Sequence, residues 1–132
     1  MNYTIRQFTS ADYSLIKSWW NMYDQVAPEL EFIPTTTYIM YFHNEPILSM
    51  SLILTNTPIG WFENYIGNPS LKGDIRKKGG NILYKYLTQI AKAQGKTRIF
   101  CMSIHDKTTK RYTEFGMQQT ATNVTTLTQE VD

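Results

Sequence analysis

The sequence has one cysteine, a small net charge and no long apolar run. These three features argue against an internal disulfide, a general polyanion binder and a membrane-spanning helix, respectively. Cys101 has no partner for an internal disulfide, so we expect a reducing compartment and predict a cytoplasmic protein. The net charge of +2 argues against a general polyanion binder. The longest apolar run, around residues 47–54, is far shorter than the ~20 residues of a membrane-spanning helix. The N-terminus also lacks the basic and apolar regions of a secretory signal.

What is present is enough for one packed domain. The 132 residues include 14% aromatic residues, which argues against disorder. A chain of this length buries roughly two thirds of the surface that its unfolded form exposes. We therefore predict a single domain over residues 1–132.

The first half of the chain reads as a strand, a helix and a hairpin. The T-x-x-D sequence at residues 9–12 is typical of a helix start, and apolar residues then recur at helical spacing. Pro28 and Pro34 mark a loop over residues 25–36. The predicted elements are a strand at 2–8, a helix at 12–23 and two strands at 37–42 and 46–54, joined by a turn at 43–45.

The second half alternates strands and helices. We predict a strand at 60–68, a helix from Gly79 or Gly80 to Gln94, a strand from Lys96 to Cys101 or Ser103, a helix at 106–115 and one or two strands within 118–131. This order indicates an α+β fold, an α/β sandwich in which about three to four helices flank a mixed sheet of six to seven strands. The strands at 60–68 and 96–101 should be parallel.

The segment RKKGGN at residues 76–81 gathers cations just before the predicted helix start. A helix start leaves backbone N–H groups free, and glycines allow close approach to an anion, so such a turn can cradle a diphosphate. Lys72, Arg76, Lys77 and Lys78 would add positive charge. The alternative is an ordinary solvated turn.

At this point the chain resembles the GNAT superfamily of N-acetyltransferases. The family motif [QR]-x-x-G-x-[GA] is similar to Arg76–Asn81, with Asn81 departing at the last fixed position. The strand WFENYIGNP resembles the fourth strand of the family, and KRYTEFGM resembles its [FY]-Y-x-x-x-G-[FM], with Arg111 in place of the usual aromatic residue. His105 stands where many members place an asparagine that helps to hold the cofactor.

The resemblance implies acetyl-coenzyme A (acetyl-CoA) as co-substrate and direct transfer of its acetyl group to an amine. The residues expected to bind it are Tyr65, Ile66, Arg76, Lys77, Lys78, Gly79, Gly80, Asn81 and His105. In this interpretation the case for an enzyme depends on free amides at residues 78–82 that hold the diphosphate.

Two side chains are predicted to carry the chemistry. Glu63 is the expected base, acting through water, because an amine must lose a proton to attack; the alternative is a surface glutamate paired across strands. Tyr112 matches the family tyrosine that protonates the departing thiolate; the alternative is an ordinary half-buried tyrosine. A backbone N–H near Tyr65 or Ile66, beside a bulge in the family's fourth strand, would bind the thioester oxygen.

The amine that accepts the acetyl group is less defined by the sequence. Trp20 and Trp61 are candidates for its pocket, although both can equally be packing residues. The acceptor is a small-molecule amine or a protein amino group, and we expect no metal, membrane or nucleic-acid partner and a monomer or homodimer. The alternative function is a catalytically inactive binding or structural module of the same fold.

Overall fold

The computed structural model describes residues 2–103, 105–122 and 124–131. One sheet forms its centre, with strand order β1-β2-β3-β4-β5. Neighbouring strands are antiparallel except β4 and β5, whose parallel pairing confirms the predicted crossover. The elements are β1 (Tyr3–Gln7), η1 (Ser10–Asp12), α1 (Tyr13–Met22), η2 (Leu30–Phe32), β2 (Thr37–Phe42), β3 (Glu45–Leu54), β4 (Ile59–Gly67), α2 (Gly73–Ala93), β5 (Arg98–Phe100) and α3 (Asp106–Phe115).

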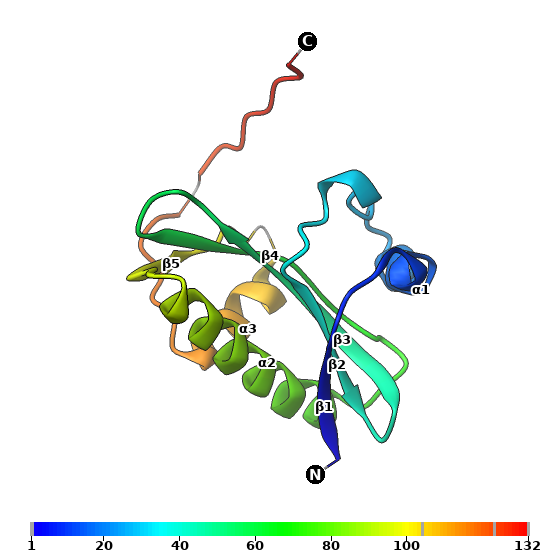
Figure 1. The fold of residues 1–132 in the computed structure, drawn as a ribbon. Helices are drawn as coiled ribbons and strands as arrows, with labels where there is room; N and C mark the ends of the chain where they lie inside the picture. Colours follow the sequence, from blue (N-terminus) through cyan, green and yellow to red (C-terminus); the bar gives the residue numbers. More distant parts are fainter. Residues whose placement is uncertain (1, 104, 123, 132) are drawn as a thin grey trace.

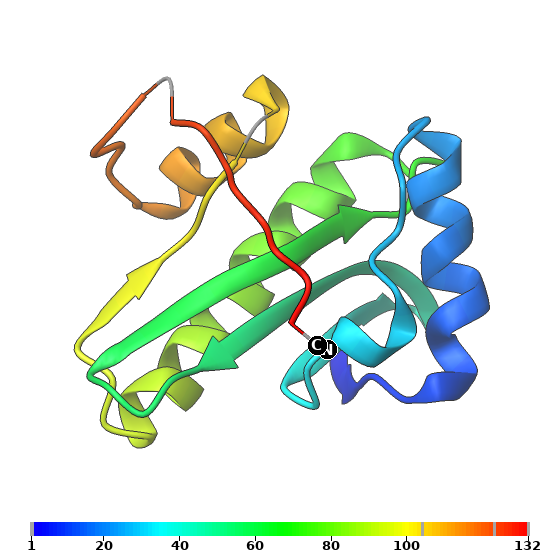
Figure 2. The same cartoon turned by 90° about the horizontal axis from the view of Figure 1, so that it is seen from above.

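The helices divide between the two faces of the sheet. α1 covers one face, hereafter the α1 face, and α2 and α3 cover the other, hereafter the α2/α3 face (Figures 1 and 2). The larger core lies under α2 and α3 and contains Met40, Ile47, Leu48, Met50, Leu52, Phe62, Leu83, Leu87, Ala91 and Tyr112. The core under α1 is smaller, with Ile16, Trp19, Ile39 and Ile66. Alternation of side chains along each strand produces this division.

The hairpin between β2 and β3 turns at His43 and Asn44. Both have left-handed backbone angles, with φ values of 49° and 64°. Positive φ at both central residues suits a two-residue turn whose twist matches that of the flanking strands. The predicted hairpin is therefore confirmed, and the pairing of its strands shifts by one residue between Met40 and Tyr41.

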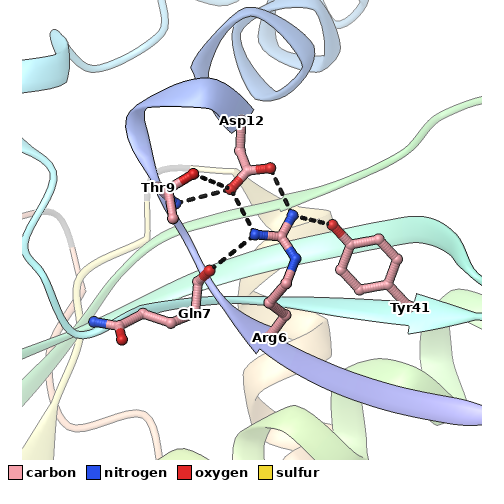
Figure 3. Close-up of polar contacts among 5 residues, drawn as sticks. All are labelled: Arg6, Gln7, Thr9, Asp12 and Tyr41. Carbon is pink, nitrogen blue, oxygen red and sulfur yellow. Dashed lines mark hydrogen bonds and ion pairs between the residues drawn. The ribbon is translucent and has the colours of Figure 1, made fainter.

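The start of α1 is tied to the sheet by a polar network around Asp12 (Figure 3). Thr9 N donates to Asp12 Oδ2 at 2.8 Å, closing the predicted T-x-x-D helix start. Arg6 of β1 donates to Asp12 Oδ1 at 2.7 Å and also to Tyr41 Oη of β2. Burial alone would raise the pKa of Asp12, but the hydrogen bonds from Arg6 and Thr9 outweigh it and hold the pKa below its ordinary value.

A glycine lies just beyond the last turn of each of the two helices that cover the α2/α3 face. Gly95 and Gly116 follow α2 and α3 with φ values of 79° and 112°, the left-handed conformation that ends helices. α3 also has the predicted bounds. None of the helices that the structure describes is long and apolar enough to cross a membrane.

Two predictions about the fold are corrected. The described residues contain five strands rather than six to seven, because residues 118–122 and 124–131 are exposed and form no strand. Their threonine-rich sequence has strand propensity, but propensity alone does not form a strand without a partner to pair with. The helix predicted from Gly79 or Gly80 begins earlier, at Gly73.

Candidate functional site

Among the residues that the structure describes, none pairs with one edge of β4 over much of its length. Its pairing with β5 runs only from Ile59–Arg98 to Trp61–Phe100. β4 then continues to Gly67, whereas residues 101–103 form no ladder with it. We call residues 62–67 of this side the open edge of β4. Backbone N–H and C=O groups here are available to an extended ligand, as at any unpaired strand edge.

A β-bulge interrupts β4 within the open edge. Ser49 pairs with Ile66 and Ser51 pairs with Glu63, so two residues, Asn64 and Tyr65, stand opposite the single residue Met50. Asn64 has a left-handed φ of 56°, an uncommon conformation that asparagine tolerates better than most residues. The bulge therefore lies where the resemblance places it, and bulges commonly re-aim side chains next to active sites.

The direction of the amides distinguishes the two residues predicted to bind the thioester oxygen. Asn68 N donates to Ile47 O of β3 at 2.8 Å. N–H groups alternate between the two edges of a strand, so the amide of Ile66 also points toward β3. The amide of Tyr65 is then the member of the predicted pair that is aimed at the open edge.

Glu63 lies on the α1 face of the sheet, opposite Ser51 of β3. Its neighbour Phe62 packs into the core under α2, which sends the Glu63 side chain to the other side. Burial raises the pKa of Glu63 above its ordinary value of 4.5. A raised pKa makes a carboxylate a stronger base at neutral pH, as proton abstraction requires. Its partner across the strand is a serine and not a cation, which disfavours the alternative of a cross-strand ion pair.

Tyr112 of α3 lies on the α2/α3 face. It is 5% exposed and stacks with Phe62 at 6.3 Å between ring centroids, with Tyr65 edge-on at 5.8 Å. Burial first, and then the proximity of Cys101, Tyr65 and Glu63, raises the pKa of Tyr112 well above its ordinary value. The phenol therefore keeps its proton at neutral pH and is able to donate it.

Cys101 lies beside these two residues but is not poised as a nucleophile. Burial, with a smaller effect of Glu63, raises the pKa of its thiol to about 11. The thiolate is the nucleophilic form, so this thiol is unreactive at neutral pH. Cys101 behaves as a small hydrophobic residue here, since it packs against the larger core.

The predicted backbone cradle at residues 78–82 is wrong. α2 begins at Gly73, with Arg76 N donating to Lys72 O at 3.3 Å. Residues 78–82 lie in the interior of this helix, where each N–H pairs with the carbonyl four residues earlier. Their amides cannot hold a diphosphate. The free N–H groups of this helix belong to its first turn, at residues 73–75.

Gly79 and Gly80 serve close packing instead. A Cβ on Gly79 would lie 2.5 Å from Ile47 Cδ1, and a Cβ on Gly80 would lie 2.9 Å from Tyr65 Oη and 3.1 Å from Phe115 Cζ. Both glycines are buried. They allow α2 to approach the sheet and α3 more closely than any other residue type would.

Cations gather in the hollow between the first turns of α2 and α3. This hollow measures ≈490 Å³ and is lined by Gly73, Asp74, Lys77, Lys107, Lys110, Arg111 and Glu114. Glu114 pairs with Lys77 at 3.3 Å, which leaves three cations of α3 to attract an anion. Lys78 and Asn81 line an adjoining hollow of ≈310 Å³.

Two arginines flank Tyr65 with unused hydrogen-bond donors. Arg76 Nε and Arg111 Nη1 are buried and have no hydrogen-bond partner among the residues that the structure describes. Arg76 Nη1 donates to Tyr23 Oη at 3.0 Å. Burial raises the pKa of Tyr65, while the charges of Arg111 and Arg76 oppose that rise, which places both cations near its phenol. Buried donors without partners are costly and favour an anionic ligand.

The other predicted residues are dispersed. His105 is exposed and occupies the position before α3, where its carbonyl accepts from Thr109 N at 3.0 Å. Trp20 packs against the core under α1, with its Nε1 buried and without a hydrogen-bond partner in the described residues. Trp61 packs edge-on against Phe100 at 5.4 Å. These contacts of both tryptophans are packing contacts.

The sequence prediction missed several residues of this region. Lys107, Lys110 and Arg111 stand at spacings that place them on one side of a helix, and this spacing was the available signal. Asn64 was recognisable only as a turn-favouring residue inside a strand pattern. Within the residues that the structure describes, no three His, Cys, Asp or Glu side chains are grouped to hold a metal ion.

The sequence matches no protein-family model and no curated protein. The structure, however, is similar to solved acetyltransferases. N-acetylglutamate synthase from Neisseria gonorrhoeae, complexed with coenzyme A and L-arginine, is 18% identical with a TM-score of 0.71 over 90% of this chain and 28% of its own. The present chain thus spans little more than a quarter of that protein.

Two shorter proteins match over nearly their whole length. Glucosamine-6-phosphate N-acetyltransferase from Arabidopsis thaliana is 12% identical, with a TM-score of 0.67 over 96% of this chain and 99% of its own. A protein from Clostridium acetobutylicum, described as a predicted acetyltransferase and solved with acetyl-CoA, is 16% identical with a TM-score of 0.62 over 96% of each chain. These are GNAT acetyltransferases, so the likeness confirms the predicted GNAT fold.

Proposed function

We propose that this chain is an N-acetyltransferase that transfers the acetyl group of acetyl-CoA directly to an amine. The observation that carries the proposal is the open edge of β4, with Glu63 on one face of the sheet and Tyr112 on the other. Because the amides of residues 78–82 are paired, the proposal no longer depends on them. It rests on this edge, on the cationic hollow and on the fold.

The residues around the open edge fit such a cofactor. The arm of coenzyme A carries amide groups, which pair with a free strand edge as another strand would. Its phosphates match the buried donors of Arg76 and Arg111 and the neighbouring Lys107 and Lys110. The solved neighbours that contain coenzyme A or acetyl-CoA support this choice of cofactor.

The cofactor supplies the thioester, and the chain supplies proton transfer and orientation. On the α1 face, Glu63 accepts the proton of the amine through water, and its raised pKa suits this task. At the bulge, the amide of Tyr65 donates a hydrogen bond to the thioester oxygen as negative charge develops there. On the α2/α3 face, Tyr112 returns a proton to the sulfur. Cys101 remains a neutral thiol, which supports direct transfer over a covalent acetyl-cysteine.

Cofactor binding is tested by thermal unfolding with coenzyme A. Ligand at about 100 times its dissociation constant should add about 2.7 kcal/mol to the free energy of unfolding. Arg111→Gln should reduce the shift, whereas Lys85→Gln, on the exposed surface of α2, should not. No shift at millimolar coenzyme A would overturn the cofactor assignment.

Catalysis is tested by thiol release from acetyl-CoA with a panel of amines and lysine-containing peptides. Release with at least one acceptor is expected, and the panel distinguishes a small-molecule amine from a protein amino group. A thermal shift without thiol release from any acceptor would instead favour the inactive binding module.

A further inference from the structure

A chain of hydrogen bonds, fully buried at its centre, leads from the β4 bulge to the loop that precedes β2. Asn64 Nδ2 donates to Ser51 Oγ at 3.2 Å, and Ser51 Oγ lies 2.7 Å from Thr37 Oγ1. Thr37 Oγ1 donates to the carbonyl of Pro34 at 2.7 Å. Ser51 is 0% exposed and Thr37 is 3% exposed, so water does not compete for these groups. We call Asn64, Ser51 and Thr37 the hydroxyl relay.

The direction of every bond in the relay is fixed. The Pro34 carbonyl only accepts, so the single hydroxyl proton of Thr37 goes to it. Thr37 must then accept from Ser51, and Ser51, having given its own proton, must accept from the amide of Asn64. Each of the two hydroxyls therefore donates its one proton and accepts one hydrogen bond. A buried network that is satisfied in this way holds its members in one arrangement.

The relay holds the residue that defines the bulge. Asn64 has the left-handed φ of 56°, a conformation that costs free energy in a non-glycine residue and persists only where its surroundings enforce it. Its neighbours on either side, Glu63 and Tyr65, carry the proposed base and the amide aimed at the open edge. If Asn64 relaxed to an extended conformation, both groups would change direction together.

We infer that Ser51 and Thr37 are positioning residues for acetyl transfer, because they hold Asn64 and thereby aim Glu63 and the Tyr65 amide. This inference rests on the proposed function. The relay touches no part of the cationic hollow, so it acts on the transfer step and not on cofactor binding. Through Pro34, the relay also joins the bulge to the loop that precedes β2. In the proposed function, the amine approaches Glu63 from the α1 face of the sheet.

The test compares Ser51→Ala and Thr37→Val with Ser49→Ala. Ser49 is also buried, at 2% exposed, and lies on the same face of β3, but it is not part of the relay. Both relay variants should lower kcat by about 10- to 100-fold, because small misplacements of reacting groups have effects of this size. The KM for acetyl-CoA should stay within about twofold. Thr37→Ser should restore kcat, and Ser49→Ala should leave it unchanged.

A second readout does not depend on activity. Amide hydrogen exchange at Ile66, whose N–H points toward β3, should accelerate in Ser51→Ala and Thr37→Val and remain unchanged in Ser49→Ala. If amide exchange is unchanged in the relay variants, the claim that the relay holds the bulge is wrong, whatever the activity of these variants. Accelerated exchange with unchanged kcat, or an equal loss of kcat in Ser49→Ala, would overturn the positioning role. Absence of turnover in the wild-type protein with every amine would overturn the proposed function, and the positioning role with it, while exchange still reports on the relay.

Discussion

The two faces of the sheet differ in size, polarity and charge. The α2/α3 face has the larger apolar core, and the α1 face has a smaller core beside buried hydroxyl groups. Residues 70–132, which form α2, β5 and α3, carry eleven cations and five carboxylates, whereas residues 1–69 carry two cations and six carboxylates. A polyphosphate ligand is therefore favoured on the α2/α3 face and an amine, protonated in solution, on the α1 face.

The open edge of β4 is where these two environments meet. Glu63 and Tyr112 lie on opposite faces, yet Glu63 contributes to the raised pKa of Tyr112, after burial, Cys101 and Tyr65. Proton removal from the amine and proton delivery to the sulfur are thus assigned to different faces. This division makes separate predictions for each face.

The largest effect is expected for Glu63→Gln, which removes the base on the α1 face. kcat should fall by about 10²–10⁴-fold, the usual contribution of a general base, while the affinity for coenzyme A stays unchanged. Steady-state kinetics and calorimetry measure the two. Glu45→Gln, at the exposed hairpin, is the matched control and should have no effect.

The same variant tests the raised pKa of Glu63. A folded-state pKa above the unfolded value means that ionising Glu63 destabilises the fold, so stability falls as the pH rises through that folded pKa. Glu63→Gln should therefore be more stable than wild type at neutral pH, and the difference should vanish below pH 4.5, the ordinary pKa. A constant difference across this range would show that Glu63 is not buried as described.

Tyr112→Phe removes the proton donor on the α2/α3 face and should have a smaller effect on rate. Because burial raises the pKa of this phenol, it is a weaker acid than usual, and we expect a loss of about 100-fold, the low end for general acids. The Kd for coenzyme A should change less than about twofold. Tyr84→Phe, in a ring that stacks on Phe115 nearby, should leave kcat intact. Equal turnover in Tyr112→Phe and wild type would remove Tyr112 from the mechanism.

Gly79→Val distinguishes packing from anion binding. A side chain here meets Ile47, Met40 and Tyr3 within 3.3 Å, so overpacking should lower the free energy of unfolding by about 1–3 kcal/mol. Urea denaturation measures this loss. Asn81→Val, two residues along on the exposed side of α2, should change stability by less than about 0.5 kcal/mol. Lost affinity for coenzyme A in a normally stable Gly79→Val protein would restore the cradle interpretation.

This glycine pair shows where sequence reasoning failed. Five strands, the hairpin and the ends of α2 and α3 follow from periodicity and turn residues, and the structure confirms them, whereas the described residues of 118–131 form no strand. The start of α2 does not follow, because two adjacent glycines read as a helix boundary when no packing partner is known. Ile47 and Tyr65, which require these glycines, are distant in the sequence.

The candidate site was also predictable only in part. Glu63 and Tyr112 were predicted because motif spacing placed them; the structure places Glu63 in β4 and packs Tyr112 against Phe62 of the same strand, and their roles stay predictions. The relay residues Ser51 and Thr37 were not found, because a buried hydroxyl in a strand has no sequence pattern of its own. Their partnership depends on the register of β2, β3 and β4, which only the fold determines.

A weaker effect is expected for the cations of the α2/α3 face. Lys107→Gln and Lys110→Gln should each raise the Kd for coenzyme A by about two- to fivefold, since exposed charges contribute up to about 1 kcal/mol. The effect should shrink at high salt, where exposed charges are screened. Titration calorimetry at two salt concentrations measures both. Lys85→Gln should not change the Kd, and an equal change there would assign the effect to overall charge.

The smallest effect is expected at the outer end of the α1 face, where Asp12 ties α1 to β1. Asp12→Asn should destabilise the fold by about 0.5–1 kcal/mol, because it weakens one helix cap and one partly exposed ion pair. The lowered pKa of Asp12 determines how its contribution to the free energy of unfolding depends on pH. This stabilisation is present above the ordinary pKa of 3.8 and is lost as the pH falls through the lower pKa of the folded state. The two proteins should therefore converge in stability in strong acid. Asp12 is remote from the open edge, so kcat should be unaltered at every pH at which both proteins are folded. A change in kcat would mean that the helix α1 is also coupled to the site, in addition to the hydroxyl relay.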